Sequence, residues 1–172
     1  MKEVLLEEVC EAKSSNIAIK DLEKNDGEYP IFGASGFIKN VDFYKFDKPY
    51  IAIVKDGAGV GRVMLLPEKS SIIGTMQAII PNENIDINYL YNVLVSKKLS
   101  KYYTGATIPH IYFKDYKKEK FNLYSIDEQK NISKQLSNVS NLIKIKTCEI
   151  NKLDELIKSQ FISQIKEGLY VN

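Results

Sequence analysis

Hydrophobic residues in the middle of the chain form short, continuous runs of the kind found in buried β-strands. Residues 50–54 (YIAIV) and 62–66 (RVMLL) are rich in β-branched and aliphatic side chains, and the glycine-rich segment 55–61 separates them. This arrangement predicts two strands joined by a glycine-rich loop. Residues 75–81 (TMQAIIP) predict a third strand, which Pro81 ends.

The spacing of apolar residues changes to a helical one in residues 86–103. Leu90, Val93 and Leu94 recur at helical spacing, and Asp86 stands where an N-cap is needed. The remaining segments of the first part are predicted as a short helix or extended entry at residues 1–13, an ordered loop region with short strands at 25–38, and strand-like segments at 111–113 and 121–123.

One long helix is predicted from Ser125 onward. Ser125 and Glu128 have the spacing of a capping box, and no Gly or Pro follows until Gly168. Apolar residues then recur in alternating steps of four and three, with Lys146 at the one interrupted position; this seam consists of Ile132, Leu136, Val139, Ile143, Ile150, Leu153 and Ile157. Such a helix is roughly 60 Å long, which favours pairing with a partner helix. A helix folded back on its own domain is the alternative.

These patterns together predict an α+β protein. A mixed or antiparallel, β-rich domain occupies residues 1–124, a long C-terminal coiled-coil helix occupies 125–167, and 168–172 form a tail. Composition agrees with one globular domain plus an added element, because 44% of the 172 residues are hydrophobic and 27% are charged.

Targeting signals and cysteine usage point to the cytoplasm. The acidic start (MKEVLLEEVCEAK) lacks the layout of a signal peptide, and no apolar run reaches membrane-spanning length. Cys10 and Cys148 are far apart in sequence and form no CxxC pair. We therefore expect a cytoplasmic protein with two reduced thiols that behave as small buried apolar residues.

Charge is distributed unevenly although the net charge is only +2. Residues 97–120 contain two acidic residues, Asp115 and Glu119, and seven basic ones, which gives a local net charge of +5; the basic residues are Lys97, Lys98, Lys101, Lys114, Lys117, Lys118 and Lys120. A basic segment on a near-neutral chain is typical of a surface that meets phosphate. A solvated lysine face is the alternative.

Catalytic patterns are missing from the sequence. The glycines of loop 55–62 do not have P-loop or dinucleotide-binding spacing, and His110 is the only histidine, so no histidine pair can hold a metal. Asp56, Asp115 and Glu119 are scattered, whereas a metal-dependent nuclease needs clustered carboxylates. We therefore predict no catalytic residue, no metal site and no cofactor on this chain.

Polar and cationic residues around the histidine instead favour binding to double-stranded DNA. Hydroxyl, imidazole and amide groups can bond base edges or phosphates, and cations neutralise phosphates. The predicted DNA-facing residues are Lys55, Arg62, Thr104, Thr107, His110, Lys114, Lys117 and Lys118, with Ser71, Thr75 and Gln77 as second choices.

Three stretches together resemble the specificity subunits of type I restriction–modification systems. They are IVKDGAGVGRVMLLPEKSSIIGTMQAIIP (53–81), YLYNVLVSKKLSKYYTGATIPHIYFKDYKKEKFNL (89–123) and SIDEQKNISKQL (125–136). In that family a target-recognition domain precedes a long helix that begins near a Pro-Leu-x-Glu-Gln type sequence. Here Glu128 and Gln129 keep the last two positions. Leu123, Tyr124 and Ser125 stand where the family usually has a proline pair.

The resemblance implies a function that the residue patterns alone do not give. A full family member is similar to two such units in tandem, so this chain looks like a half-subunit that forms a homodimer through antiparallel C-terminal helices and reads a bipartite, inverted-repeat site. It would position methyltransferase (modification) subunits, which hold S-adenosylmethionine, and restriction subunits would join them. The alternative is an assembly factor or decoy that binds these subunits through the helix and reads no DNA.

Overall fold

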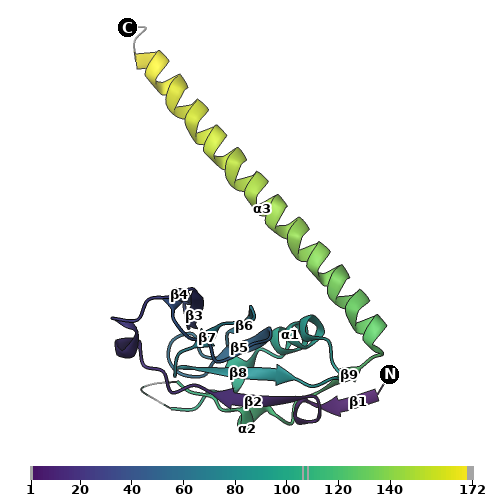
Figure 1. The fold of residues 1–172 in the computed structure, drawn as a ribbon. Coiled ribbons are helices and arrows are strands. Elements are labelled where there is room, and N and C mark those ends of the chain that lie inside the picture. The colour runs from purple at the N-terminus through teal and green to yellow at the C-terminus, as the bar shows by residue number, and fades with distance from the viewer. Residues whose placement is uncertain (1, 106, 108, 170–172) are drawn as a thin grey trace. The chain divides into compact units, whose positions relative to one another are not determined.

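The computed structural model describes residues 2–105, 107 and 109–169. The chain forms two compact units, Met1–Asn131 and Ile132–Asn172. The first unit is a β-rich head, and the second unit consists of the long helix α3 beyond its first turns (Figure 1). The predicted α+β class, with a β-rich domain followed by a long helix, is confirmed.

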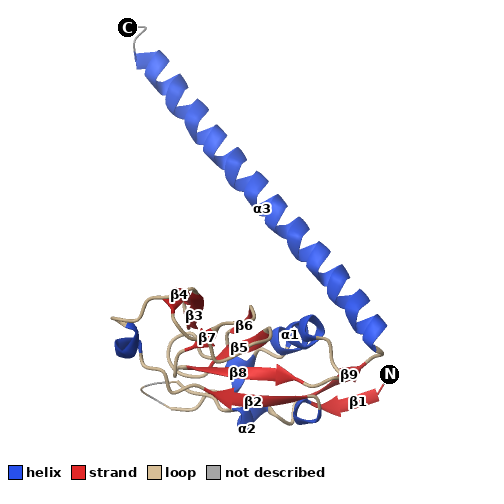
Figure 2. Ribbon diagram, viewed as in Figure 1, coloured by secondary structure: helices blue, strands red, loops and turns tan. Residues whose placement is uncertain are grey.

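The larger sheet of the head has the strand order β2–β8–β5–β6, and all neighbouring strands are antiparallel (Figure 2). Its strands are β2 (Cys10–Ser14), β8 (Met76–Pro81), β5 (Tyr50–Val54) and β6 (Val63–Leu66). All five residues of β5 are buried, which explains the continuous apolar run in the sequence. The three strands predicted in this region are therefore confirmed.

Two smaller sheets complete the strands of the head. Strand β3 (Tyr29–Gly33) pairs antiparallel with β4 (Gly36–Val41) and parallel with β7 (Ser71–Ile72). Strand β1 (Lys2–Leu5) pairs antiparallel with β9 (Lys120–Leu123), so the start of the chain lies beside the segment that leads into α3. The head thus contains mixed and antiparallel sheets.

Helices in the head are short. The side chain of Asp86 accepts hydrogen bonds from the N–H groups of Asn88 and Tyr89, and it caps α1 (Ile87–Ser96) as predicted. The 3₁₀ segments are η1 (Leu6–Glu8), η2 (Ile19–Leu22) and η3 (Leu99–Tyr102), and α2 covers Phe113–Tyr116. The strand expected at 111–113 is wrong, because the Asp115 carboxylate accepts from the N–H of Tyr112 and starts a helical turn there.

Buried apolar side chains form the core of the head. Tyr50, Ala52 and Val54 pack with Met76 and Ala78 of β8 in one buried cluster. A second cluster joins η2, β3 and β4 through four buried residues, Leu22, Ile31, Val41 and Ile73. Because these clusters anchor the strand ends, they fix the places where the connecting loops leave the sheet.

The capping box predicted at the start of α3 (Ile126–Leu169) is confirmed. The backbone N–H of Ser125 donates to the Glu128 carboxylate at 3.0 Å, and the N–H of Glu128 donates to the Ser125 hydroxyl at 3.4 Å. The hydrogen bonds from Ser125 also hold the pKa of Glu128 below its ordinary value. The first unit continues to Asn131, beyond the boundary at 124 that the sequence suggested, because the first turns of α3 belong to it.

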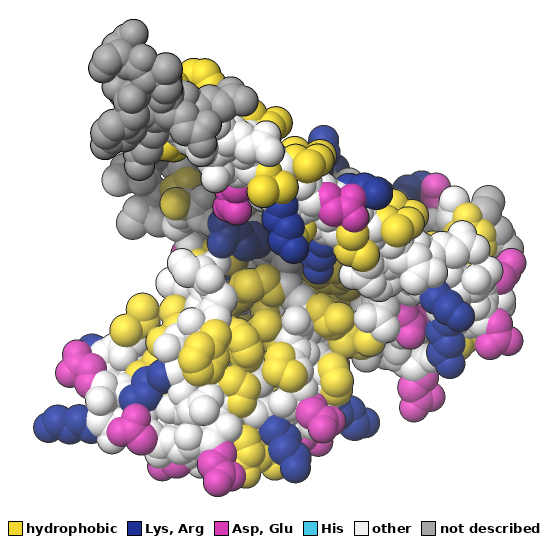
Figure 3. Space-filling model, turned by 90° about the horizontal axis from the view of Figure 1, so that it is seen from above, with side chains coloured by type: hydrophobic (Ala, Val, Ile, Leu, Met, Phe, Trp, Pro, Cys, Tyr) yellow, Lys and Arg dark blue, Asp and Glu magenta, His cyan; other side chains and the backbone are white. Residues whose placement is uncertain are grey.

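Apolar side chains are exposed along the second unit, next to charged ones (Figure 3). The apolar seam residues from Leu136 to Ile157 are 43% to 64% exposed, whereas Ile132 is partly buried. Cys148 is exposed as well, which corrects the expectation that both cysteines are buried; only Cys10 is. Exposure on this scale leaves room for a partner surface along the helix.

Candidate nucleic-acid interface

Three loops meet where β5 ends. The backbone N–H groups of Lys55 and Asp56 both donate to the carbonyl of Thr75, at 3.0 and 3.2 Å. From the other side, the N–H of Ile111 donates to the carbonyl of Lys55 at 2.9 Å, and the N–H of Gly57 donates to that of Pro109 at 2.9 Å. We call these segments, residues 55–62, 73–75 and the described residues 104, 105, 107 and 109–111, the loop end. Main-chain hydrogen bonds make it one surface, although the three segments are far apart in sequence.

Glycines shape the first of these loops for packing as well as for turning. Gly57 and Gly61 have φ values of +92° and +83°. A Cβ on Gly61 would lie 2.4 Å from the backbone nitrogen of Ser100, so the loop touches η3 directly, whereas a Cβ on Gly57 would meet nothing within 4 Å. Gly61 is therefore needed for the close contact between the loop and η3, whereas the space next to Gly57 is open.

Both cations of this loop have partners. The Lys55 ammonium lies 2.8 Å from the carboxylate of Asp56, and both side chains are largely buried. Arg62 is exposed, and its guanidinium donates to the carbonyl of Ala34 at 2.8 Å. Arg62 thereby attaches the β3–β4 turn to the loop end. Only the Gly- and Ser-containing turn itself hints at this contact in the sequence.

Thr104 and His110 pair with each other at the base of the third loop. Their backbones exchange two hydrogen bonds of 2.9 Å, and the Thr104 hydroxyl lies 3.1 Å from Nε2 of His110. The His110 ring lies 5.3 Å from the ring of Tyr112. Thr75 and Thr107 are exposed in the same group of loops. The structure therefore brings together six of the predicted residues: Lys55, Arg62, Thr75, Thr104, Thr107 and His110.

Ser71 and Gln77 do not belong to this surface. Ser71 is fully buried, and its hydroxyl accepts from the N–H of Lys45 at 3.0 Å. Gln77 is 7% exposed, and its side-chain carbonyl accepts from the Tyr116 hydroxyl at 3.0 Å. Gln77 lies on β8, a strand between two neighbours, and the first four residues of β8 are all buried. Burial raises the pKa of Tyr116, which keeps that hydroxyl protonated as the donor.

The lysines of residues 97–120 are largely paired with carboxylates. Lys97 and Lys101 lie 3.1 and 2.5 Å from Glu119, Lys117 lies 2.6 Å from Glu7, and Lys120 lies 2.9 Å from Glu3. Among the described residues, Lys98, Lys114 and Lys118 have no ion pair. The positive surface is therefore weaker than the local net charge suggested, because Glu3 and Glu7 come from a distant part of the sequence.

Glu119 is the centre of the strongest electrostatic cluster in the head. Its side chain is 11% exposed and receives hydrogen bonds from Lys97, Lys101 and the hydroxyl of Tyr102. Burial opposes ionisation, but these donors outweigh it and lower the pKa of Glu119 to about 2. In the sequence Glu119 is only a scattered carboxylate within a basic segment, whereas in the structure it joins η3 to the start of β9.

Lys114 and Lys117 lie apart from the loop end in the hydrogen-bond network. The Lys117 carbonyl accepts from the N–H of Glu7, which places it beside η1, and the Lys114 ammonium lies 5.4 Å from the ring centre of Tyr112. Tyr112 follows Ile111, so Lys114 extends the loop end along α2, whereas Lys117 faces the N-terminal segment.

Residues 2–105, 107 and 109–169 contain no group of three His, Cys, Asp or Glu side chains that could hold a metal ion.

Residues 1–155 match a protein family described as "Type I restriction modification DNA specificity domain". The chain belongs to this family. The resemblance drawn from its sequence motifs is thereby confirmed.

Solved specificity subunits share the fold. The chain is 21% identical to the type I restriction–modification S subunit from M. genitalium, with a TM-score of 0.67 over 84% of this chain and 42% of that one. The chain is 20% identical to the HsdS subunit from Thermoanaerobacter tengcongensis, with a TM-score of 0.62 over 83% of this chain and 38% of that one. It is 18% identical to a chain from a structure that addresses complex assembly and conformational transition of the type I R-M system. The TM-score is 0.66 over 83% of this chain and 39% of that one.

The chain spans about two fifths of the length of these three solved chains. No curated protein sequence matches it significantly. In the described part of the chain, no helix is both long and apolar enough to cross a membrane.

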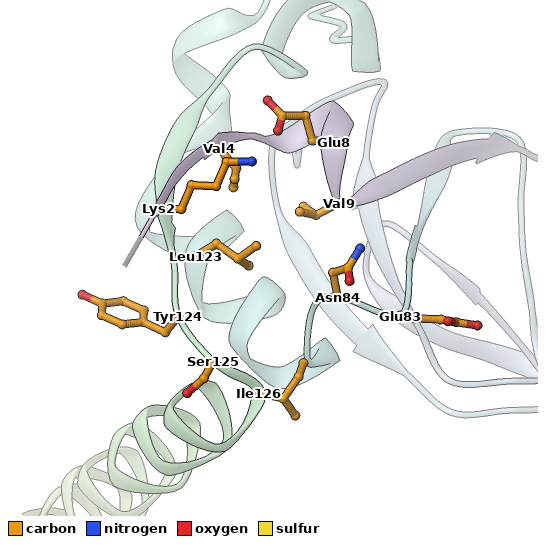
Figure 4. A pocket seen from close by; sticks show the side chains of 10 residues that line it. All are labelled: Lys2, Val4, Glu8, Val9, Glu83, Asn84, Leu123, Tyr124, Ser125 and Ile126. Carbon is orange, nitrogen blue, oxygen red and sulfur yellow. The ribbon is translucent and has the colours of Figure 1, made fainter.

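The specificity-domain head has a cavity of about 400 Å³ where α3 begins (Figure 4). Val4, Val9, Leu123 and Ile126 line it with apolar groups, while Glu8 adds a carboxylate. The lining residues come from β1, from η1 and the residue after it, from the loop after β8, and from the stretch between the end of β9 and the first residue of α3. This cavity is separate from the loop end and contains none of the predicted DNA-facing residues.

Proposed function

We propose that this specificity-family chain reads double-stranded DNA with the loop end. The observation that carries the proposal is the joining of three distant segments, through the carbonyls of Thr75, Lys55 and Pro109, into one surface with hydroxyl, imidazole and guanidinium groups. Loops held on a rigid sheet suit such a task, because they vary in sequence while the scaffold keeps their position.

The candidate DNA-facing residues, in the loop end and outside it, divide by the DNA group that they suit. Arg62, Lys114 and Lys118 suit phosphates, with Lys98 as a further candidate from the same basic segment. Thr75, Thr104, Thr107 and His110 suit base edges or phosphates. Lys55 and Lys117 contribute less, because Asp56 and Glu7 already pair with them. Ser71 and Gln77 support the fold instead.

The chain acts as a non-catalytic subunit in this proposal. Methyl transfer belongs to partner methyltransferase subunits, which carry S-adenosylmethionine, and restriction subunits join the same assembly. The exposed seam of α3 supports pairing of two copies into a homodimer. A two-fold dimer presents the loop end twice, so its DNA site is a bipartite inverted repeat.

A salt titration of DNA binding tests the reading function. Each lysine that contacts a phosphate adds about one unit to the slope of log K against log salt. The Lys114→Ala and Lys118→Ala variants should each lower that slope by about one, while Lys117→Ala, whose lysine is paired with Glu7, should change it less. Binding to no DNA of any sequence, together with capture of methyltransferase subunits, would establish the assembly-factor alternative.

Site selection tests the two-fold geometry. Co-expression with the cognate methyltransferase subunit and mapping of methylated bases across the genome should yield two identical half-sites in inverted orientation. An asymmetric, undivided site would contradict the homodimer, and so would a monomer at micromolar concentration in light scattering.

A further inference from the structure

Lys146 interrupts the apolar seam of α3 near its middle. Its ammonium forms an ion pair of 2.8 Å with Glu149, three residues later on the same helix, and both side chains are exposed. The seam residues on either side, Ile143 and Ile150, are also exposed, at 61% and 58%. A single lysine inside a coiled-coil seam determines how helices align, at a cost in stability.

Charge along α3 is opposite in the two halves of the seam. Residues 130–146 contain four lysines and no acidic residue, whereas 147–157 contain three acidic residues and one lysine. Antiparallel pairing of two copies brings unlike halves together, and parallel pairing brings like halves together. Parallel pairing would also place Lys146 directly against Lys146 of the second copy, in the middle of the interface.

Alternating steps of four and three allow antiparallel pairing in which every seam residue faces another seam residue. We propose that two copies of α3 pair antiparallel in a single register, with the two-fold axis midway between Lys144 and Ile145. The inference rests on the proposed homodimer and adds its register. The facing pairs across the two copies are Ile132 with Ile157, Leu136 with Leu153, Val139 with Ile150, and Ile143 with Lys146.

Registers shifted by one heptad lose apolar pairs. A shift one way places Leu136 against Gln160, and the opposite shift places Leu153 against Gln129. Gln129 is fully buried in the first unit, where its amide group bonds to backbone, so it offers nothing to a second helix. The proposed register therefore buries the most apolar surface, and it places each Lys146 opposite Ile143 of the second copy instead of opposite the second Lys146.

Distances between spin labels test the register. Lys134 and Glu155 are exposed, and in the proposed register they lie equally far from the two-fold axis. Lys134→Cys and Glu155→Cys are made in the full chain with Cys148→Ser. Cys10 stays unlabelled, because it is buried and burial raises its pKa to about 12. Both variants should show the same axial separation between the two labels, about 32 Å at 1.5 Å per residue.

Each other result has a distinct meaning. A heptad shift gives unequal axial separations, about 42 and 21 Å, and overturns the register while the dimer stands. Parallel pairing gives short separations in both variants and overturns antiparallel pairing. Absence of a dipolar signal at micromolar concentration overturns the dimer itself.

Lys146 is tested separately by replacing it with an apolar residue. Lys146→Ile should make parallel alignment tolerable and add a short-distance population in both labelled variants. Lys144→Ile removes the same charge outside the seam and should leave the distance distribution unchanged. An unchanged distribution in Lys146→Ile would show that the lysine does not select the alignment.

Discussion

The side-chain carbonyl of Gln129 accepts a hydrogen bond of 2.7 Å from the backbone N–H of Asp86. Asp86 caps α1, and Gln129 lies in the first turns of α3, so one side chain joins the starts of two helices within the first unit. The Gln129 amide also donates to the carbonyls of Tyr124 and Asn84, at 2.9 and 3.2 Å. Since Gln129 is fully buried, these bonds replace water for three backbone groups.

Removing this side chain should destabilise the head. Gln129→Ala leaves three backbone groups without their side-chain partner, and each such buried group costs about 1–3 kcal/mol. Because these hydrogen bonds are only partly buried, water can replace some of them, and we expect a total loss of about 2–4 kcal/mol in the free energy of unfolding, measured by urea denaturation followed by circular dichroism. Gln135→Ala, on an exposed part of α3, is the matched control and should change little. Equal stability of both variants would contradict the role of Gln129.

Tyr116→Phe should weaken the fold without changing sequence preference. The change removes the donor to the Gln77 carbonyl and leaves a buried acceptor unsatisfied, at a cost of about 1–3 kcal/mol. Thermal unfolding measures the loss, and binding to a panel of DNA sequences should keep the same ranking. Tyr103→Phe, at an exposed tyrosine, serves as the control. If the ranking of DNA sequences changes in Tyr116→Phe, Gln77 contributes to sequence preference after all.

Stability of the head should fall in acid partly because of Glu119. Its pKa of about 2 in the folded state lies below the ordinary carboxyl value, so its stabilisation is fully present above about pH 4.5. That contribution is lost progressively as the pH falls from there toward 2. Glu119→Gln should be less stable at pH 7 by about 1–3 kcal/mol and should lose less stability between pH 5 and 2.

Denaturant titrations across this pH range measure the effect, with Glu68→Gln as the control at an exposed carboxylate. If the free energy of unfolding falls by the same amount between pH 5 and 2 in the wild type and in Glu119→Gln, then Lys97, Lys101 and Tyr102 do not perturb this carboxyl group.

Gly61 and Gly57 should respond differently to alanine. Both have positive φ, which costs an alanine about 1–2 kcal/mol at either position. Only at Gly61 would the new Cβ also collide with the backbone of Ser100. Gly61→Ala should therefore lower the free energy of unfolding by about 2 kcal/mol more than Gly57→Ala, measured in the same urea series. Equal costs would show that the contact between the loop and η3 relaxes easily.

Local patterns in the sequence were enough to predict most of the head. The hairpin of β5 and β6, strand β8, the Asp86 cap and the Ser125–Glu128 box all depend on residues within a few positions of one another. The segment 111–113 was misread, because Asp115 closes a helical turn back onto Tyr112. An aspartate three residues after the turn start was the available sign.

Pairings between distant residues could not be predicted in this way. Nothing near Lys117 or Lys120 in the sequence indicates that Glu7 and Glu3 neutralise them, since the contact depends on β1 pairing with β9. Gln77 was predicted to face DNA because an amide group can bond base edges, but the sheet order places it on an inner strand. Such errors arise from topology, which sets burial.

The hydrogen bonds of Gln129 decide where the recognition domain can be exchanged. A chimera that takes the head from one family member and the helix from another, with its junction at residue 124, would separate this glutamine from the loop before α1 that it holds. A junction after Asn131 keeps the whole first unit with its own supporting turns. The modular part of this protein thus ends inside the long helix rather than before it.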